Sequence, residues 1–381
     1  MLSSLNLTGN QSGDDVLAIQ FDSFPHREGK LVLRAQENVS GSTEMADNAF
    51  LLNNPAAGKT FPTWTAEPLP DKQTDGDLAM TLTKLISGAT TPYRRNQDDP
   101  DDAMNKGVQV AYRVERNGKP VMNWQPVSVE TADATGNQIF TGYGPNGNQA
   151  RWNGDEATFT YQFGLWPDEP AWKVRLQMTQ NTDFSSDDEW TAQNIPVAPG
   201  SQQSFQSFNG TVGAGARGRG GPAAATVTTP PAAPTPCAEA DVNGHHIKVF
   251  PAVQFTNQPA RPANLPANVV YTTQPQQTGL IIQVQPAVQN YVARPGLNGT
   301  QPADDGWRLT LAKITDGQGG EFQNSGTSWS TAGTGADSVS TIRITLRDTG
   351  DVTNFNTTIA IHKNRFFEFT VKPEKAAAEQ N

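Results

Sequence analysis

The chain has a single cysteine, Cys237, among its 381 residues, so no intrachain disulfide can form. A thiol-based metal site would need further cysteine or histidine ligands, which the surrounding PPAAPTPCAEA does not supply. No run approaches the roughly 18 apolar residues of a membrane-spanning helix. The first residues, MLSSLNLTGNQSGDD, lack the basic and apolar regions of a signal peptide. We therefore expect no insertion of this segment into a membrane. An N-terminus that is incomplete would leave association with the cell envelope open.

Charged residues are also scarce, at 17%, and apolar residues make up 35%, whereas glycine and proline are frequent, at 34 and 28. Disorder driven by high charge does not fit this composition. Many short strands joined by polar loops do fit it. The formal net charge of −10 disfavours binding to polyanions. We expect no nucleic-acid partner.

The usual enzyme motifs are missing. The tripeptide Gly58-Lys59-Thr60 resembles the end of a phosphate-binding loop, but the position of that motif's first glycine is occupied by Asn53. Pro62 then prevents the helix whose N-terminus would face the phosphates. We interpret the tripeptide as a turn. The chain has no G-x-S-x-G and no H-E-x-x-H sequence, and its histidines are four: His26, His245, His246 and His362.

Alternation of apolar and polar residues dominates the rest of the chain and predicts β-strands. Asn117-Gly118 follows one such segment and favours a tight hairpin turn. DLAMTLTKL has a period of two rather than that of a helix. The side chains that we expect on buried strand faces are Leu78, Met80, Leu82, Val108, Val110, Tyr112, Val114, Phe159, Tyr161, Phe163, Trp172, Val174, Leu176, Met178, Ile342, Ile344, Leu346, Phe367, Phe369 and Val371.

Residues 199–241 interrupt this pattern with a Gly/Ser-rich and then Pro/Ala-rich composition that is typical of a linker. We therefore predict an all-β protein of tandem immunoglobulin-like β-sandwich domains joined by a Gly/Pro-rich linker. The expected segments are a partial or small β unit at 1–70, sandwiches at 71–198 and 242–375, the linker between them, and a tail at 376–381.

Two pairs of segments resemble each other and indicate a diverged internal repeat. QFDSFPHREGKLVLR, from Gln20, matches QFGLWPDEPAWKVRL, from Gln162. TADATGNQIF, from Thr131, matches TDGQGGEF, from Thr315. Chance similarity between alternating strands and Asp-Gly turns is the alternative.

The stretches DGDLAMTLTKL, NWQPVSVETADATGN, LWPDEPAWKVRLQ and IHKNRFFEFTVKP resemble segments of large, uncharacterised β-rich multi-domain proteins of environmental bacteria. The resemblance runs in patches between Phe50 and Pro373. It implies several sandwiches and an association with the envelope, and it transfers no activity and no functional residues.

One acidic loop is the candidate metal site. NQDDPDDAMNKG holds several carboxylates that could converge on a hard cation, although Pro100 stiffens the loop and the spacing is not that of an EF-hand. A solvated acidic loop is the alternative. The candidate ligands are Asp98, Asp99, Asp101 and Asp102.

Three aromatic residues in polar surroundings are candidate ligand contacts. Tyr143 and Trp152 belong to GYGPNGNQARWNGDE, and Trp329 belongs to NSGTSWSTAGTG. Aromatic side chains on polar loops are a means by which β-sandwich modules bind sugars or peptides. A tryptophan packed beneath its own loop is the alternative.

Two other carboxylates are predicted to be structural. Asp133 and Asp316 each end a strand and precede a glycine by three residues, as in a type I turn. Asparagine makes the same turn, so we expect Asp133→Asn to be nearly neutral.

The sequence thus favours a non-catalytic structural, spacer or adhesion-like protein with no cofactor and with other proteins or glycans as partners. The alternative is a carbohydrate-binding accessory module or a β-rich glycoside hydrolase, because the carboxylate pair of a glycosidase is defined by its spatial separation and cannot be found in sequence.

Overall fold

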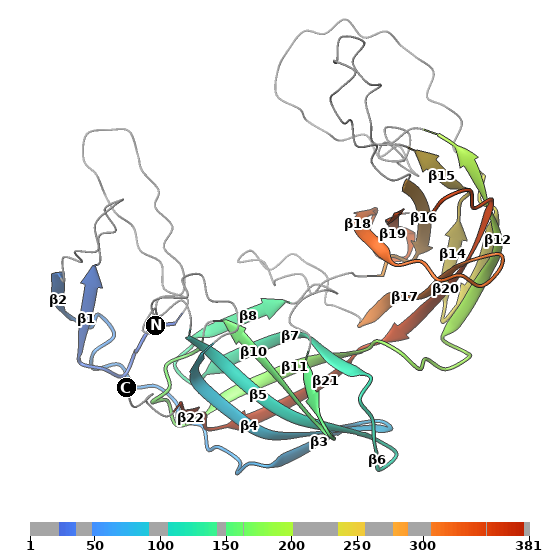
Figure 1. Cartoon of the computed structure of the whole chain (residues 1–381). Helices are drawn as coiled ribbons and strands as arrows, with labels where there is room; N and C mark the ends of the chain where they lie inside the picture. The colour runs from blue at the N-terminus through green and yellow to red at the C-terminus, as the bar shows by residue number, and fades with distance from the viewer. Residues whose placement is uncertain are drawn as a thin grey trace, which may run out of the picture. The chain divides into compact units, whose positions relative to one another are not determined.

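The computed structural model describes residues 23–35, 48–90, 106–142, 150–162, 164–200, 235–255, 277–288, 306–347 and 349–376 (Figure 1). Apart from a short 3-10 turn at Gly335–Asp337, the regular elements of these residues are β-strands in several mainly antiparallel sheets. The all-β prediction is confirmed. No helix in these ranges is long and apolar enough to cross a membrane.

The described strands belong to two compact units, and the division differs from the expected segments. Unit 1 contains β1 to β11 together with β21 and β22, and unit 2 contains β12 to β20. The predicted sandwich at 71–198 therefore ends early, because β12 (Glu189–Pro199) pairs with strands of unit 2. The predicted sandwich at 242–375 loses β21 (Arg365–Val371), which pairs with β11 (Trp172–Gln180) of unit 1.

Unit 1 is built from two larger sheets and a ribbon. The four-stranded sheet has the order β21, β11, β7 (Trp124–Asp133) and β8 (Gln138–Gly142). The path of the other large sheet is β22 (Glu374–Lys375), β4 (Leu78–Thr90), β5 (Lys106–Arg116), β10 (Glu156–Gln162) and β9 (Arg151–Asn153), with β3 (Asp71–Asp75) and β6 (Lys119–Pro120) added to β4 and β5. The ribbon consists of β1 (Lys30–Ala35) and β2 (Asn48–Asn53).

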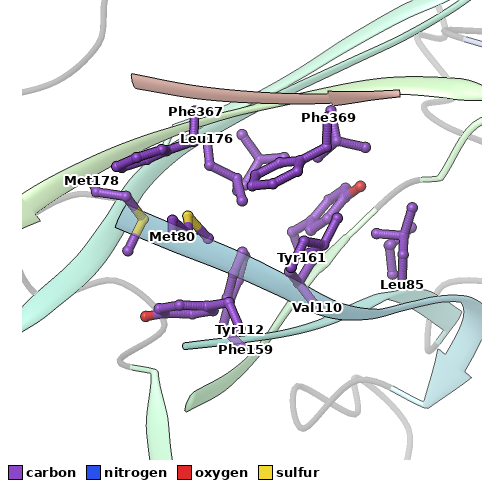
Figure 2. Close-up of a cluster of buried hydrophobic side chains, with 14 of the residues drawn as sticks. Met80, Leu85, Val110, Tyr112, Phe159, Tyr161, Leu176, Met178, Phe367 and Phe369 are labelled. Carbon is purple, nitrogen blue, oxygen red and sulfur yellow. The ribbon is translucent and has the colours of Figure 1, made fainter. Parts of the chain in front are cut away.

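One hydrophobic core joins the two larger sheets of unit 1. Figure 2 shows side chains of β11 and β21, such as Leu176 and Phe367, on one side of it and Met80 and Val110 on the other. The predicted alternation is confirmed at the described positions, because the expected residues from Leu78 to Met178 and from Phe367 to Val371 are at most 3% exposed. Phe163 lies outside the described residues.

A β-bulge explains the one change of period in this core. Leu82 and Leu85 are both fully buried although they are three residues apart. The register between β4 and β5 shifts between Leu82 and Lys84, and the extra residue returns Leu85 to the inner face.

The predicted hairpin turn is present between β5 and β6. Arg116 pairs with Lys119, so Asn117 and Gly118 form a two-residue loop. Their φ angles of 51° and 74° are the positive values that a type I′ turn requires.

Unit 2 is a nine-stranded sheet around a second core, which contains Ile342, Ile344 and Leu346. Its path is β13 (Ala238–Val242), β14 (His245–Val249), β16 (Gln277–Gln285), β15 (Ala252–Phe255), β12, β20 (Asn354–Lys363) and β17 (Trp307–Asp316). On the other edge of β16 lie β19 (Val339–Arg347) and then β18 (Asn324–Ala332).

The predicted linker extends too far at its C-terminal end. Residues 238–241 belong to β13, where Ala238 pairs with Val249 and Ala240 with Ile247. These residues resemble the linker in sequence, but their backbone pairs with β14 and they therefore form a strand. Residues 201–234 of the predicted linker lie outside the described residues, as do 377–381 of the predicted tail.

Candidate functional site

The candidate metal ligands Asp98, Asp99, Asp101 and Asp102, and the candidate ligand contact Tyr143, lie outside the described residues. Within the described ranges, the structure brings together no group of three or more His, Cys, Asp or Glu side chains that could hold a metal ion.

Trp152 belongs to a strand rather than to a loop. It lies on β9, opposite Ala157 of β10, while its neighbours Arg151 and Asn153 are exposed. Its ring is half-buried against the core of unit 1, with its centroid 5.9 Å from that of Tyr112 in an edge-to-face arrangement. Part of its apolar surface therefore packs against the sheet, although not beneath a loop of its own, and its role as a ligand contact stays a prediction.

Trp329 is also on a strand, because β18 pairs it with Ile342 of β19. It is the half-buried residue of an otherwise exposed strand, and it packs against the core of unit 2. The polar, glycine-containing sequence around it predicted a loop. This segment is a strand instead, because its backbone pairs with the apolar strand β19.

The turn at Asp133 is confirmed and is more extensive than a type I turn. The Oδ1 atom of Asp133 accepts hydrogen bonds from the Thr135 amide at 2.8 Å, the Thr135 hydroxyl at 2.7 Å and the Asn137 amide at 3.1 Å. Its Oδ2 atom accepts a bond from Asn137 Nδ2 at 2.7 Å. Asp133 is 3% exposed, so its carboxylate is buried and bonded on both oxygens.

The turn at Asp316 has the same backbone plan. Asp316 Oδ1 accepts bonds from the amides of Gln318 and Gly320, at 2.8 and 2.7 Å, and its carbonyl accepts the Gly319 amide. The second pair of similar segments therefore forms one type of turn twice. The first pair differs, because it leads into the ribbon strand β1 in one case and into the core strand β11 in the other.

The N-terminal described segment is attached to the Asp133 turn. The Phe24 amide donates to Asn137 Oδ1 at 2.9 Å, and Asn137 Nδ2 donates to the Phe24 carbonyl at 2.8 Å. The Nδ1 atom of His26 lies 3.0 Å from the Thr135 carbonyl oxygen, and the His26 ring stacks on Phe61.

An ion pair between a partly exposed arginine and a buried carboxylate makes the second attachment. The Nε atom of Arg27 donates to both carboxylate oxygens of Glu169, at 3.2 and 2.9 Å. Glu169 is 1% exposed, whereas about a third of the Arg27 side chain is accessible. Neither residue was a candidate from sequence, although both lie in the first pair of similar segments.

The tripeptide Gly58-Lys59-Thr60 is part of a turn, as predicted. The Lys59 amide donates to the Ala56 carbonyl, and Gly58 has a φ of 83°. Asn54 closes the turn by accepting the Ala56 amide with its side chain. No helix follows in the described residues.

His245 and His246 are adjacent on β14, so their side chains point to opposite faces of the strand, and they differ in burial. His246 lies between two carboxylates, 2.9 Å from Glu239 Oε2 and 2.9 Å from Asp241 Oδ1. His245 is 4% exposed, with Nδ1 2.9 Å from the Pro286 carbonyl oxygen.

His362 is a buried titratable group of unit 2. It is 3% exposed, with Nε2 3.0 Å from the Thr310 hydroxyl and its ring packed on Phe184 at 4.9 Å between centroids. Burial lowers the pKa of His362 to about 4; nearby Asp188 raises it and Arg308 lowers it further. A neutral imidazole at physiological pH follows.

An outer face of unit 1 carries aromatic rings beside cations, which sequence reasoning did not find. Lys173 lies 5.0 Å from the centroid of the Trp64 ring, and the Arg175 guanidinium lies 4.8 Å from that of Phe366. Lys173 and Arg175 are exposed alternate residues of β11. The signal in the sequence was the polar half of the β11 alternation, from which no site was predicted.

Comparisons with known proteins add one structural neighbour. No family model matches the chain, and no curated protein matches it. A crystal structure of a conserved domain protein from Bacillus anthracis aligns over 81% of this chain and 91% of its own, at 8% identity and a TM-score of 0.17.

Proposed function

We propose that this chain is a non-catalytic β-sandwich protein, a structural, spacer or adhesion-like scaffold that acts through its surfaces on other proteins or glycans. The observation that carries the proposal is the use of its buried carboxylates. Both oxygens of Asp133 and both oxygens of Glu169 accept hydrogen bonds from the protein itself. A general acid or nucleophile needs an oxygen that can reach a substrate.

These carboxylates have a structural task. Asp133 accepts a hydrogen bond from the Asn137 side chain, and the same side chain donates to the Phe24 carbonyl. Glu169 forms an ion pair with Arg27. Together they attach the segment before the ribbon to the two-sheet body of unit 1. The two sheets around one core support an immunoglobulin-like arrangement for this unit.

The experiment compares wild type with Glu169→Gln. The scaffold proposal expects a lower melting temperature for the variant and no turnover of polysaccharide, ester or peptide substrates by wild type. Turnover by wild type that Glu169→Gln abolishes without a change in melting temperature would refute the proposal.

A carbohydrate-binding module is the second candidate, and the aromatic face of unit 1 is the observation that favours it. Trp64 and Phe366 present ring surface beside Lys173 and Arg175. Sugar rings stack on such surfaces through their C–H faces. A glycan array tests this candidate: binding that Trp64→Ala removes and Trp329→Ala retains would support it, and unchanged binding in Trp64→Ala would exclude that face.

A further inference from the structure

The β1–β2 ribbon exposes large apolar side chains on both of its faces. The register places Val32 opposite Leu51, and successive residues of a strand point to opposite faces, so Phe50 and Leu52 occupy the other face. The exposed fractions are 61% for Val32, 65% for Leu51, 50% for Phe50 and 46% for Leu52. In the part of the chain that the structure describes, Met122 is the only other large apolar residue so exposed.

The two edges of the ribbon differ in charge. β1 contains Lys30 and Arg34, whereas β2, with the sequence NAFLLN, contains no charged residue, glycine or proline. Charged residues on an edge strand, lysine above all, oppose pairing with another chain. An uncharged apolar edge favours such pairing. Among the described strands, β1 and β2 pair only with each other.

A lipid bilayer does not fit this ribbon. Its hydrocarbon region has no partners for the backbone N–H and C=O groups of an open strand edge, so only helices and closed barrels cross it.

A two-stranded ribbon is also only marginally stable by itself in water. The fitting occupant supplies both a strand for the β2 edge and apolar side chains beside it.

We propose that the β2 edge pairs with β2 of a second copy of this chain, antiparallel and related by a two-fold axis at Leu51. This axis is perpendicular to the sheet, so each face of one ribbon continues into the same face of the second copy. A residue of β2 can therefore lie opposite only those β2 residues of the second copy whose side chains point to the same face. Centring on Leu51 places Phe50 opposite Leu52 of the second copy, twice. Centring on Phe50 would place Leu52 opposite Asn48 and pair fewer apolar side chains.

The resulting four-stranded sheet has the order β1, β2, β2, β1. No like charges face each other across its centre, and the strands that contain Lys30 and Arg34 form both outer edges. The contact is therefore isologous and closes as a dimer instead of continuing into a fibre. This dimer goes beyond the scaffold function proposed above and does not depend on it.

Sedimentation velocity of the full chain over a range of concentrations tests the dimer. We expect a monomer–dimer equilibrium for wild type and for Met122→Lys, which adds the same charge at an equally exposed apolar position elsewhere in unit 1. Leu51→Lys places two cations directly opposite each other and should weaken dimerisation at least about tenfold. A wild type that stays monomeric, a Leu51→Lys variant that dimerises like wild type, or open-ended oligomers would each overturn the proposal.

Oxidative cross-linking tests the register. In a Cys237→Ser background, Leu51→Cys should form a disulfide-linked dimer, because the two copies of this position lie directly opposite each other. Val32→Cys is equally exposed but lies on the far strand, and it should remain monomeric. Equal cross-linking of both variants would overturn the pairing. Neither readout measures glycan binding or turnover, so failure of the dimer and failure of the proposed function are distinguishable.

Discussion

The side-chain amide of Asn137 and the backbone of Phe24 exchange two hydrogen bonds, with the Phe24 amide donating to Oδ1 and Nδ2 donating to the Phe24 carbonyl. One side chain thereby imitates the backbone of a strand partner. The same Nδ2 also donates to Asp133 Oδ2, so the turn and the N-terminal segment share one amide.

Asn137→Ala should destabilise unit 1 by roughly 2–3 kcal/mol, because it removes several hydrogen bonds and leaves the buried Asp133 oxygen without a donor. Thermal unfolding measures the loss. Hydrogen exchange then separates the causes: the Phe24 amide should lose protection in the variant, while amides of the core strand β5 keep theirs at temperatures well below the transition. Retained protection at Phe24 would contradict the assigned bond.

Asp133→Asn should not be neutral, which reverses the expectation from sequence. Oδ1 has three donors, so the new NH₂ group must take the place of Oδ2 and face the NH₂ group of Asn137. We expect a loss of about 1–3 kcal/mol, the usual consequence of leaving a buried donor unpaired.

Asp316→Asn is the matched control for this substitution. The two hydrogen bonds from the Gln318 and Gly320 amides to the Asp316 side chain are both accepted by Oδ1, and an asparagine oxygen replaces that atom. Its melting temperature should remain within about 2 °C of wild type, which corresponds to roughly 0.5 kcal/mol. Equal effects of the two substitutions in calorimetry would refute the argument from Oδ2.

Arg27→Ala should destabilise more than Glu169→Gln. The first substitution leaves a buried carboxylate without its cation, and breaking a buried pair in this way costs roughly 3–5 kcal/mol. Because a third of the Arg27 side chain is accessible to solvent, we expect about 2–3 kcal/mol.

Glu169→Gln removes the buried negative charge, so no buried charge is left without a partner. We expect it to lower the free energy of unfolding by roughly half as much as Arg27→Ala does. Lys72→Ala breaks the exposed pair with Glu115 and serves as a control, with an expected change of less than about 1 kcal/mol. Urea denaturation of the three variants measures the order. An effect of Arg27→Ala as small as that of Lys72→Ala would contradict the buried pair.

Acidification should destabilise unit 2 through His362. Its folded pKa of about 4 lies below the ordinary value of 6.5. Between these values the unfolded chain binds the proton and the folded chain does not, so stability is complete above pH 6.5 and is lost as the pH falls toward 4. The loss amounts to at most about 3–4 kcal/mol, at 1.36 kcal/mol for each of about 2.5 pKa units.

His362→Gln cannot titrate and should show a smaller decrease in stability between pH 7 and pH 4.5. Urea denaturation of wild type and variant at both values measures the difference. The same decrease in both proteins would exclude His362 as the cause.

The sequence by itself determined the class of the fold and most of the core. Alternating side chains form strands because successive residues of a strand point to opposite faces, so Tyr112, Trp172 and Phe369 were identifiable as buried before any pairing was known. Asn117-Gly118 and the turns at Asp133 and Asp316 were also predictable, because turn chemistry acts within a few residues.

Only the tertiary structure decided which strands pair and what that pairing does to single residues. The alternation of β21 specifies a buried face but no partner, so its assignment to β11 was not readable in the sequence. Trp152 and Trp329 lie on strands and pack partly against the two cores because β10 and β19 lie beside them. The bonds of Asn137 to Phe24 and of Arg27 to Glu169 join residues more than a hundred positions apart, and such contacts follow from the packing of whole sheets rather than from any local pattern.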